Sequence, residues 1–148
     1  MGVEIERKFL VKLSELPNPL PQGEEFEQGY LSTDPTVRVR LVQRPDGTRH
    51  AELTIKGKGK LTRAEWNYPI PAEDAEALLR LCSRSLRKIR RVIGRVELDH
   101  FPDHDLWLAE IELQSEDEPY ERPPWLGDEV TGDSRYANSR LARERTGE

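Results

Sequence analysis

The sequence predicts an α+β fold, mainly β, built on a closed, roughly eight-stranded antiparallel β-barrel with a charged lumen and helices packed outside. Apolar and charged residues alternate with a period of two in about eight separate runs. Turn-forming residues divide these runs, and most connections are short enough for hairpins. Each readable run also carries one charged face. We therefore expect residues 1–148 to form a single domain around a charged tunnel.

The predicted strands follow one another along most of the chain. In order, they cover residues 3–11, 25–32, 36–44, 48–56, 62–70, 86–93, 95–101 and 106–114. Asp34-Pro35, Pro45-Asp46-Gly47, Gly57-Lys58-Gly59 and Gly94 mark turns between neighbouring strands. Short turns join antiparallel neighbours, whereas parallel strands need long crossovers. The spacing therefore favours an antiparallel sheet.

Two helices are predicted. The first begins near Pro71, and Ala75, Leu78, Leu79 and Cys82 form one apolar stripe at helical spacing. Cys82 is the one cysteine of the chain, and its place in this stripe predicts a core residue. The second helix is expected over residues 135–145, after a capping Asp133-Ser134 pair.

Composition limits the possible partners. Acids and bases nearly balance, with a net charge of −5, so no broad basic field is available for nucleic acid. No apolar stretch is long enough to cross a bilayer, and the start lacks a secretory pattern. We expect a cytoplasmic protein with no membrane partner. Both a monomer and a homodimer fit the sequence.

The charged faces repeat one sign at positions i and i+2. The acidic pairs are Glu4/Glu6, Glu97/Asp99 and Glu110/Glu112, and the basic pairs are Arg38/Arg40 and Lys88/Arg90. For any single strand, the simplest interpretation of the charged face is that it is exposed to solvent. A solvated face, however, gains from mixed signs and loses from like charges, so segregated pairs favour a ligand of opposite sign between the strands.

Closing such strands with the charged face inward would place the apolar core outside the barrel, beneath the first helix and the Pro123-Pro124-Trp125 segment. Burying unpaired charges costs several kcal/mol per ion. The lumen must therefore stay wet or receive counter-charges. A cation bound together with a polyanion would satisfy both signs.

These motifs resemble the CYTH superfamily of triphosphate tunnel metalloenzymes. The matching segments run in order through nearly the whole chain: Glu4-Ile-Glu-Arg-Lys8, Arg38-Val-Arg40, Leu53-Thr-Ile-Lys56, Lys88-Ile-Arg90, Glu97-Leu-Asp99, Glu110-Ile-Glu112 and Arg135-Tyr-Ala-Asn138. The small size and the Pro-Pro-Trp-Leu-Gly segment are similar to short bacterial members that hydrolyse inorganic triphosphate. The resemblance implies a small-molecule triphosphate substrate and Mg2+ or Mn2+ as cofactor.

The resemblance also implies roles for individual residues. The expected phosphate-binding residues are Lys8, Arg38, Arg40, Lys56, Lys88, Arg90 and Arg135. The expected metal ligands are Glu4, Glu6, Asp99, Glu110 and Glu112, and the expected orienting residues are Glu65 and Glu97. Ser134 departs from the pattern, because many members carry a basic residue there, which bears on one distal contact and on substrate preference.

Lys88 is the expected catalytic base, since neighbouring positive charge favours a neutral lysine. A purely phosphate-binding Lys88 fits the sequence equally well. Hydrolysis of tripolyphosphate is the predicted function. Cyclisation of ATP and hydrolysis of nucleoside or thiamine triphosphates are the alternatives on the same tunnel, and a non-catalytic polyphosphate-binding module is a further one.

Overall fold

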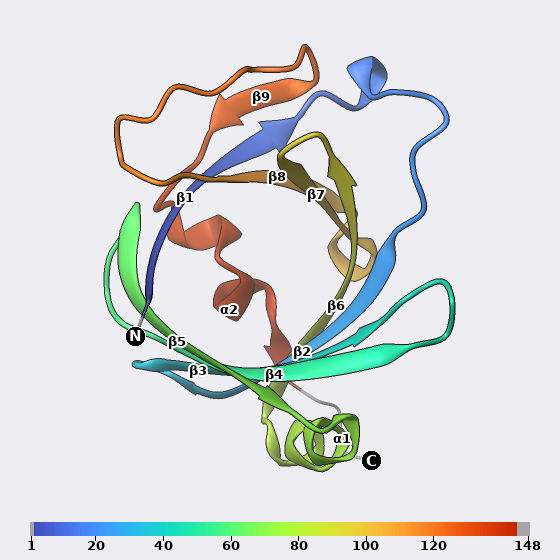
Figure 1. Cartoon of the computed structure of the whole chain (residues 1–148), viewed down its shortest axis with the longest axis vertical. Helices are drawn as coiled ribbons and strands as arrows, with labels where there is room; N and C mark the ends of the chain where they lie inside the picture. Colours follow the sequence, from blue (N-terminus) through green and yellow to red (C-terminus); the bar gives the residue numbers. More distant parts are fainter. Residues whose placement is uncertain (1, 145–148) are drawn as a thin grey trace.

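A computed structural model describes residues 2–144, and a ring of eight antiparallel strands forms its centre (Figure 1). The ring consists of β1 (Gly2–Val11), β2 (Glu24–Thr33), β3 (Thr36–Gln43), β4 (Arg49–Lys56), β5 (Thr62–Ile70), β6 (Arg84–Ile93), β7 (Val96–Phe101) and β8 (Leu106–Glu112). Its spatial order is β6-β2-β3-β4-β5-β1-β8-β7, and pairing between β6 and β7 closes it. The predicted closed barrel is confirmed.

The strand boundaries agree closely with the predicted ones because the turn residues end the alternation sharply. Gly47 and Gly94 sit in the tight turns after β3 and β6 with φ of 87° and 62°, a region that favours glycine. The register then fixes which side chains face inward. Arg38 lies opposite Thr54, and Glu97 lies opposite Glu110, so charged positions of neighbouring strands meet on the same face.

The helix α1 (Ala72–Leu81) lies on the outside of the barrel, as predicted (Figure 1). Its buried residues Ala75 and Leu79 pack against Val39 of β3 and Ala51 of β4. This contact buries the apolar face that these strands turn away from the lumen. None of the helices within residues 2–144 is long and apolar enough to span a bilayer.

A larger outer core covers β1, β7 and β8. Phe9, Leu98 and Ile111 point away from the lumen and pack with Trp125. Trp125 precedes β9 (Leu126–Glu129), which pairs with β1 and was not predicted. Four residues are too few to show an alternating pattern, and β9 forms because β1 extends past the residues that pair with β5.

The C-terminal segment differs from the predicted helix over 135–145. It forms a 3-10 turn (Ser134–Tyr136), the short helix α2 (Asn138–Leu141) and the short strand β10 (Arg143–Glu144), which pairs with β6; Arg145 lies outside the described residues. Three 3-10 turns lie among the described residues, the others being Leu13–Glu15 and Pro102–His104.

Unlike α1, α2 lies within the ring of strands (Figure 1). Leu141 and Ala142 pack against Leu86, Phe101 and Leu108, which share their strand faces with the charged positions of β6, β7 and β8. Part of the barrel interior is therefore apolar and filled by the chain itself. The expectation that helices pack outside holds for α1 and does not hold for α2.

The outer core makes a direct prediction about stability. The Leu98 side chain is 0% exposed, whereas Leu81, at the end of α1, is 72% exposed. We expect Leu98→Ala to lower the free energy of unfolding by about 2–5 kcal/mol, because it leaves a cavity in a packed layer. The matched control Leu81→Ala should change it by less than about 0.5 kcal/mol. Urea unfolding of both variants checks this, and equal losses would contradict an outer core.

Candidate active site

The inward-facing charged side chains line one pocket inside the barrel. Its walls carry seven acidic and seven basic side chains: Glu4, Glu6, Glu52, Glu65, Glu97, Glu110 and Glu112 with Lys8, Arg38, Arg40, Lys56, Arg63, Lys88 and Arg90. Tyr30, Thr36, Asn67 and residues 137–139 complete the lining. The formal charges of these side chains cancel, so the pocket as a whole avoids a large net buried charge.

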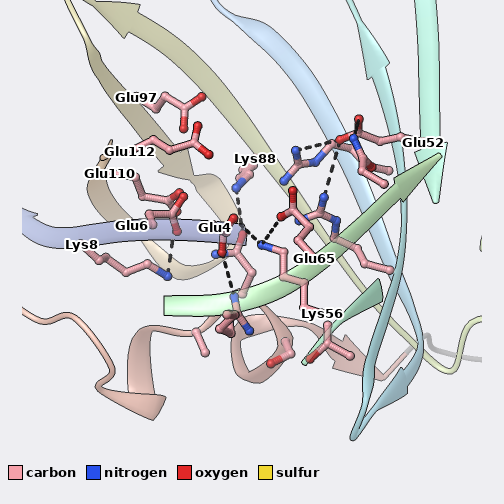
Figure 2. Close-up of a pocket in the computed structure, with 18 of the residues that line it drawn as sticks. Glu4, Glu6, Lys8, Glu52, Lys56, Glu65, Lys88, Glu97, Glu110 and Glu112 are labelled. Atoms are coloured by element: carbon pink, nitrogen blue, oxygen red, sulfur yellow. Dashed lines mark hydrogen bonds and ion pairs between the residues drawn. The ribbon is translucent and has the colours of Figure 1, made fainter. Parts of the chain in front are cut away.

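Acidic side chains gather where β1, β7 and β8 lie side by side. The carboxylates of Glu6, Glu97 and Glu110 each offer one oxygen, and these oxygens lie within 4.8 Å of one another. Glu97 pairs with Glu110 in register, and Glu112, which pairs with Glu6, joins them at the edge. Figure 2 shows all four on one side of the pocket. We call Glu6, Glu97 and Glu110 the acidic cluster.

The electrostatics of the acidic cluster suit a divalent cation. Burial raises the pKa of Glu6 well above its usual range, and nearby Glu110 raises it further. Burial also raises the pKa of Glu97. Burial opposes ionisation of Glu110 too, but Lys8, Lys88 and Arg90 outweigh it and hold its pKa well below the usual range. Carboxylate oxygens at this spacing are the donors that hard divalent cations prefer, so the residues fit such an ion.

Arginine and lysine side chains from β3, β4 and β6 occupy other walls of the pocket. Arg40 donates to Gln28 Oε1 at 2.8 Å and to Glu52 at 3.2 Å. Arg38 donates to Thr54 at 3.0 Å, while its Nε is buried without a hydrogen-bond partner among the described residues. An unpaired buried donor is costly, and an oxyanion in the pocket would satisfy it.

The like-charged pairs are partly neutralised by neighbouring strands. Lys56 of β4 contacts Glu4 at 2.8 Å and Glu65 at 3.6 Å. Arg90 of β6 contacts Asp99 of β7 at 2.8 Å. The sequence argument held that such pairs repel unless a ligand lies between strands, but much of the repulsion is relieved by strands of opposite sign. The acidic cluster keeps its like-charge contacts.

Lys88 has the most enclosed ammonium group in the pocket, with a side chain that is 1% exposed. Its Nζ donates to Asp99 Oδ2 at 2.7 Å and to Asn138 Oδ1 at 2.9 Å. The pKa of Lys88 is lowered to about 7, chiefly by burial and also by Arg90 and Arg40, while Asp99 opposes the shift. The direction agrees with the sequence argument, although burial contributes more than neighbouring positive charge.

Asp99 and Glu97 lie at different depths in the lumen. Asp99 was expected to bind metal, but its carboxylate is fully buried and is held by Lys88 and by Arg90, which donates to both of its oxygens. Glu97 was expected to orient basic residues; it does contact Arg90 at 3.1 Å, but it also belongs to the acidic cluster. Alternation places both on the inner face and cannot tell how deep each one lies.

Two further residues expected in the site lie outside the acidic cluster. Arg135 is 76% exposed, pairs with Asp133 and does not line the pocket. Glu4 lies in the pocket but contacts Lys56 and Arg63, outside the acidic cluster. Burial opposes ionisation of Glu4, yet Lys56 holds its pKa below the usual value. Lys8 lies where expected, 3.9 Å from Glu110.

Several lining residues were not assigned to the site from the sequence. Glu52 and Arg63 lie two residues from inward-facing positions, Thr54 and Glu65, so extending the alternation would have found them. Gln28 does not line the pocket but holds Arg40 and Asn138, which do; its strand mixes aromatic and polar residues on the inward face, so no sequence signal identified it. Asn138 reaches the pocket through the C-terminal segment, whose path no local pattern predicts.

Replacing each of the two acids by its amide tests their separate roles. We expect Glu97→Gln to weaken Mn2+ binding about tenfold or more, because it removes a cluster carboxylate, and to change stability little. Asp99→Asn should instead lower the free energy of unfolding by about 3–5 kcal/mol, because it removes the buried carboxylate that pairs with both Lys88 and Arg90. Calorimetric titration with Mn2+ and urea unfolding provide the two readouts, with exposed Glu73→Gln as control. A folded Asp99→Asn that loses more Mn2+ affinity than Glu97→Gln would contradict the assignment.

Comparison with known proteins supports this description. The family model for the CYTH domain matches residues 2–143. An inorganic triphosphatase of Acetivibrio thermocellus is 36% identical over 97% of this chain and 95% of its own, and one of Nitrosomonas europaea is 38% identical over 94% and 96%. The crystal structure of the inorganic triphosphatase NE1496 superposes with a TM-score of 0.58, at 33% identity over 99% of both chains. The chain therefore belongs to the CYTH domain family.

Proposed function

We propose that this protein hydrolyses a linear triphosphate inside the barrel, with inorganic tripolyphosphate preferred, and releases orthophosphate. The observation that carries the proposal is the pairing of a carboxylate cluster with buried arginines and lysines in one lumen. The two curated relatives, both named inorganic triphosphatase, share more than a third of their residues with nearly all of this chain.

The charge balance favours a polyanion bound together with cations. The seven acids and seven bases of the lining cancel, so a polyphosphate alone would leave a large negative excess in a poorly solvated space. A triphosphate that carries divalent cations restores the balance. The cations would then contact the acidic cluster, and the phosphate oxygens would contact the basic side chains.

The acidic cluster, with Glu112 beside it, would hold the divalent cation, and we propose Mg2+ or Mn2+ because both accept carboxylate oxygens. A cation bound there neutralises phosphate charge and favours displacement at phosphorus. Arg38 and Arg40 lie on other walls and Arg90 lies beside the acidic cluster, and the guanidinium groups of all three suit bidentate contacts with phosphate oxygens. Lys8 and Lys56 add point charges.

For the reaction, we assign proton transfer to Lys88. A water oxygen forms a bond to the terminal phosphorus while the bond from that phosphorus to the bridging oxygen breaks. The electron pair of that bond leaves with diphosphate, and the neutral Lys88 amine takes a proton from the attacking water. Orthophosphate and diphosphate are the products, and the lysine returns its proton to solvent. Asp99 stabilises the ammonium form between these steps.

The pocket favours hydrolysis over cyclisation of ATP. Among the described lining residues Tyr30 is the one aromatic side chain, and its hydroxyl accepts from Gln28 at 3.3 Å. A cyclase has to place an adenine and activate a ribose hydroxyl, and this lining consists of groups that bind phosphate and cations. Nucleoside and thiamine triphosphates are the alternative substrates for the same tunnel. The cytoplasmic location, the monomeric or homodimeric state and the absence of nucleic-acid or membrane partners stay predictions.

Phosphate release from tripolyphosphate, ATP and diphosphate tests the proposal, with Mg2+, with Mn2+ and with chelator. We expect metal-dependent release from tripolyphosphate that Glu6→Gln reduces at least about a hundredfold, because the variant weakens the acidic cluster. Glu73→Gln, on the exposed side of α1, serves as control. Tight binding of tripolyphosphate without phosphate release would indicate a binding module, and cyclic AMP formed from ATP would indicate a cyclase.

The pKa of Lys88 sets the expected pH dependence. A base must be neutral, so kcat/KM should rise with pH and level off above about 7. Lys88→Met should reduce kcat by about 100-fold or more and leave the affinity for tripolyphosphate within a few-fold. Stopped-flow binding and steady-state rates between pH 5.5 and 9 provide the comparison. A variant that loses affinity and turnover together would assign Lys88 to phosphate binding instead.

A further inference from the structure

Asn138 is a partly buried contact of Lys88 that comes from outside the barrel strands. It is the first residue of α2, the short helix within the ring. Its Oδ1 accepts a hydrogen bond from Lys88 Nζ at 2.9 Å. The same oxygen accepts from Gln28 Nε2 at 3.4 Å, so the C-terminal segment is joined to both β6 and β2.

The surrounding hydrogen bonds determine which atom Asn138 presents. Arg40 Nε can only donate, so the Gln28 atom that faces it at 2.8 Å must be the amide oxygen. Gln28 therefore turns its NH2 group toward Asn138, and the side-chain oxygen of Asn138 accepts the hydrogen bond. That oxygen is the acceptor Lys88 needs. The amide of Asn138 is thus oriented by a chain of contacts that begins at Arg40.

Two acceptors leave one direction free at the lysine nitrogen. Nζ is tetrahedral and carries three positions besides the bond to its own carbon. Asp99 and Asn138 accept along two of them. The rings of Phe26 and Phe101 flank Nζ at 5.6 Å and 5.5 Å and offer no oxygen or nitrogen acceptor. Lys88 lines the charged pocket, and we assign the third position to the pocket interior, since neither ring offers an acceptor there.

Loss of one proton then has a defined geometric result. The neutral amine keeps two N–H bonds, and these stabilise it most when they donate to the two fixed acceptors, Asp99 and Asn138. Its lone pair takes the third position. With Asp99 as the one remaining acceptor, Nζ could rotate about its bond to carbon and turn an N–H into the pocket. Asn138 removes that freedom.

We propose that Asn138 is a positioning residue, which directs the lone pair of Lys88 at the attacking water. The inference rests on the proposed function, because it assigns Lys88 as the base. Asparagine supplies an acceptor without a charge. The charged groups that already face Lys88 are Asp99 of β7, Glu110 of β8, Arg90 of β6 and Arg40 of β3. A second carboxylate on α2 would add to the attraction of Asp99 and hold the lysine in its ammonium form.

Two substitutions of Asn138 test the inference. Asn138→Ala should lower kcat for tripolyphosphate about tenfold or more and leave KM within about twofold, since it frees the lone pair without removing a phosphate contact. The near-isosteric Asn138→Asp should move the rise of the kcat pH profile upward by about one pH unit or more, because a carboxylate favours the ammonium. Arg140→Ala, an exposed position on the same helix, is the matched control and should match the unsubstituted protein.

A titration without substrate or metal separates this inference from the proposed function. The 13Cε resonance of Lys88 reports its protonation directly, and it should titrate at higher pH in Asn138→Asp than in the unsubstituted protein. Unchanged kcat in Asn138→Ala together with an unchanged pH profile in Asn138→Asp would overturn the positioning role. If Asn138→Ala does not fold, the Asn138→Asp profile decides. Absence of phosphate release from the unsubstituted protein would instead overturn the proposed function.

Discussion

The balance of buried charge inside the barrel is the constraint on which the rest of this structure depends. An ionised group removed from water costs several kcal/mol unless it is paired. Here Asp99, at 0% exposure, holds both Lys88 and Arg90, so one carboxylate compensates two cations. The excess positive charge is met by neighbouring acids such as Glu110. The lumen is therefore a network in which each charge depends on its neighbours.

This constraint places the apolar core in unusual positions. Because the inner face is charged, β1, β7 and β8 turn their apolar side chains outward, beneath Trp125 and β9. Likewise, α1 covers the outward face of β3 and β4. The C-terminal segment then fills an apolar part of the interior with Leu141 and Ala142. Apolar side chains therefore pack both outside the barrel and in part of its interior, and the charged pocket occupies the rest of the interior.

The same arrangement links stability to chemistry. Burial is what lowers the pKa of Lys88 to about 7, and burial is maintained by the phenylalanine rings and the C-terminal segment around it. Burial also raises the pKa of Glu6 and Glu97, so a positive counter-charge is needed to keep these carboxylates ionised. A protein that only needed to fold would gain by replacing such groups with apolar ones. Their presence is consistent with binding a cation and a polyanion in the same space.

Much of the fold and part of the site followed from the sequence alone. Strict alternation and turn residues specify the eight strands, their antiparallel pairing and the face on which Glu6, Arg38 or Lys88 must lie, since these properties depend on neighbours in the chain. Tertiary structure decided the rest. Which of Glu97 and Asp99 joins the acidic cluster depends on depth within the lumen, and Arg135 is excluded from the pocket by the path of a short segment. The approach of Asn138 to Lys88 joins residues fifty positions apart, a contact that the path of the C-terminal segment into the barrel creates.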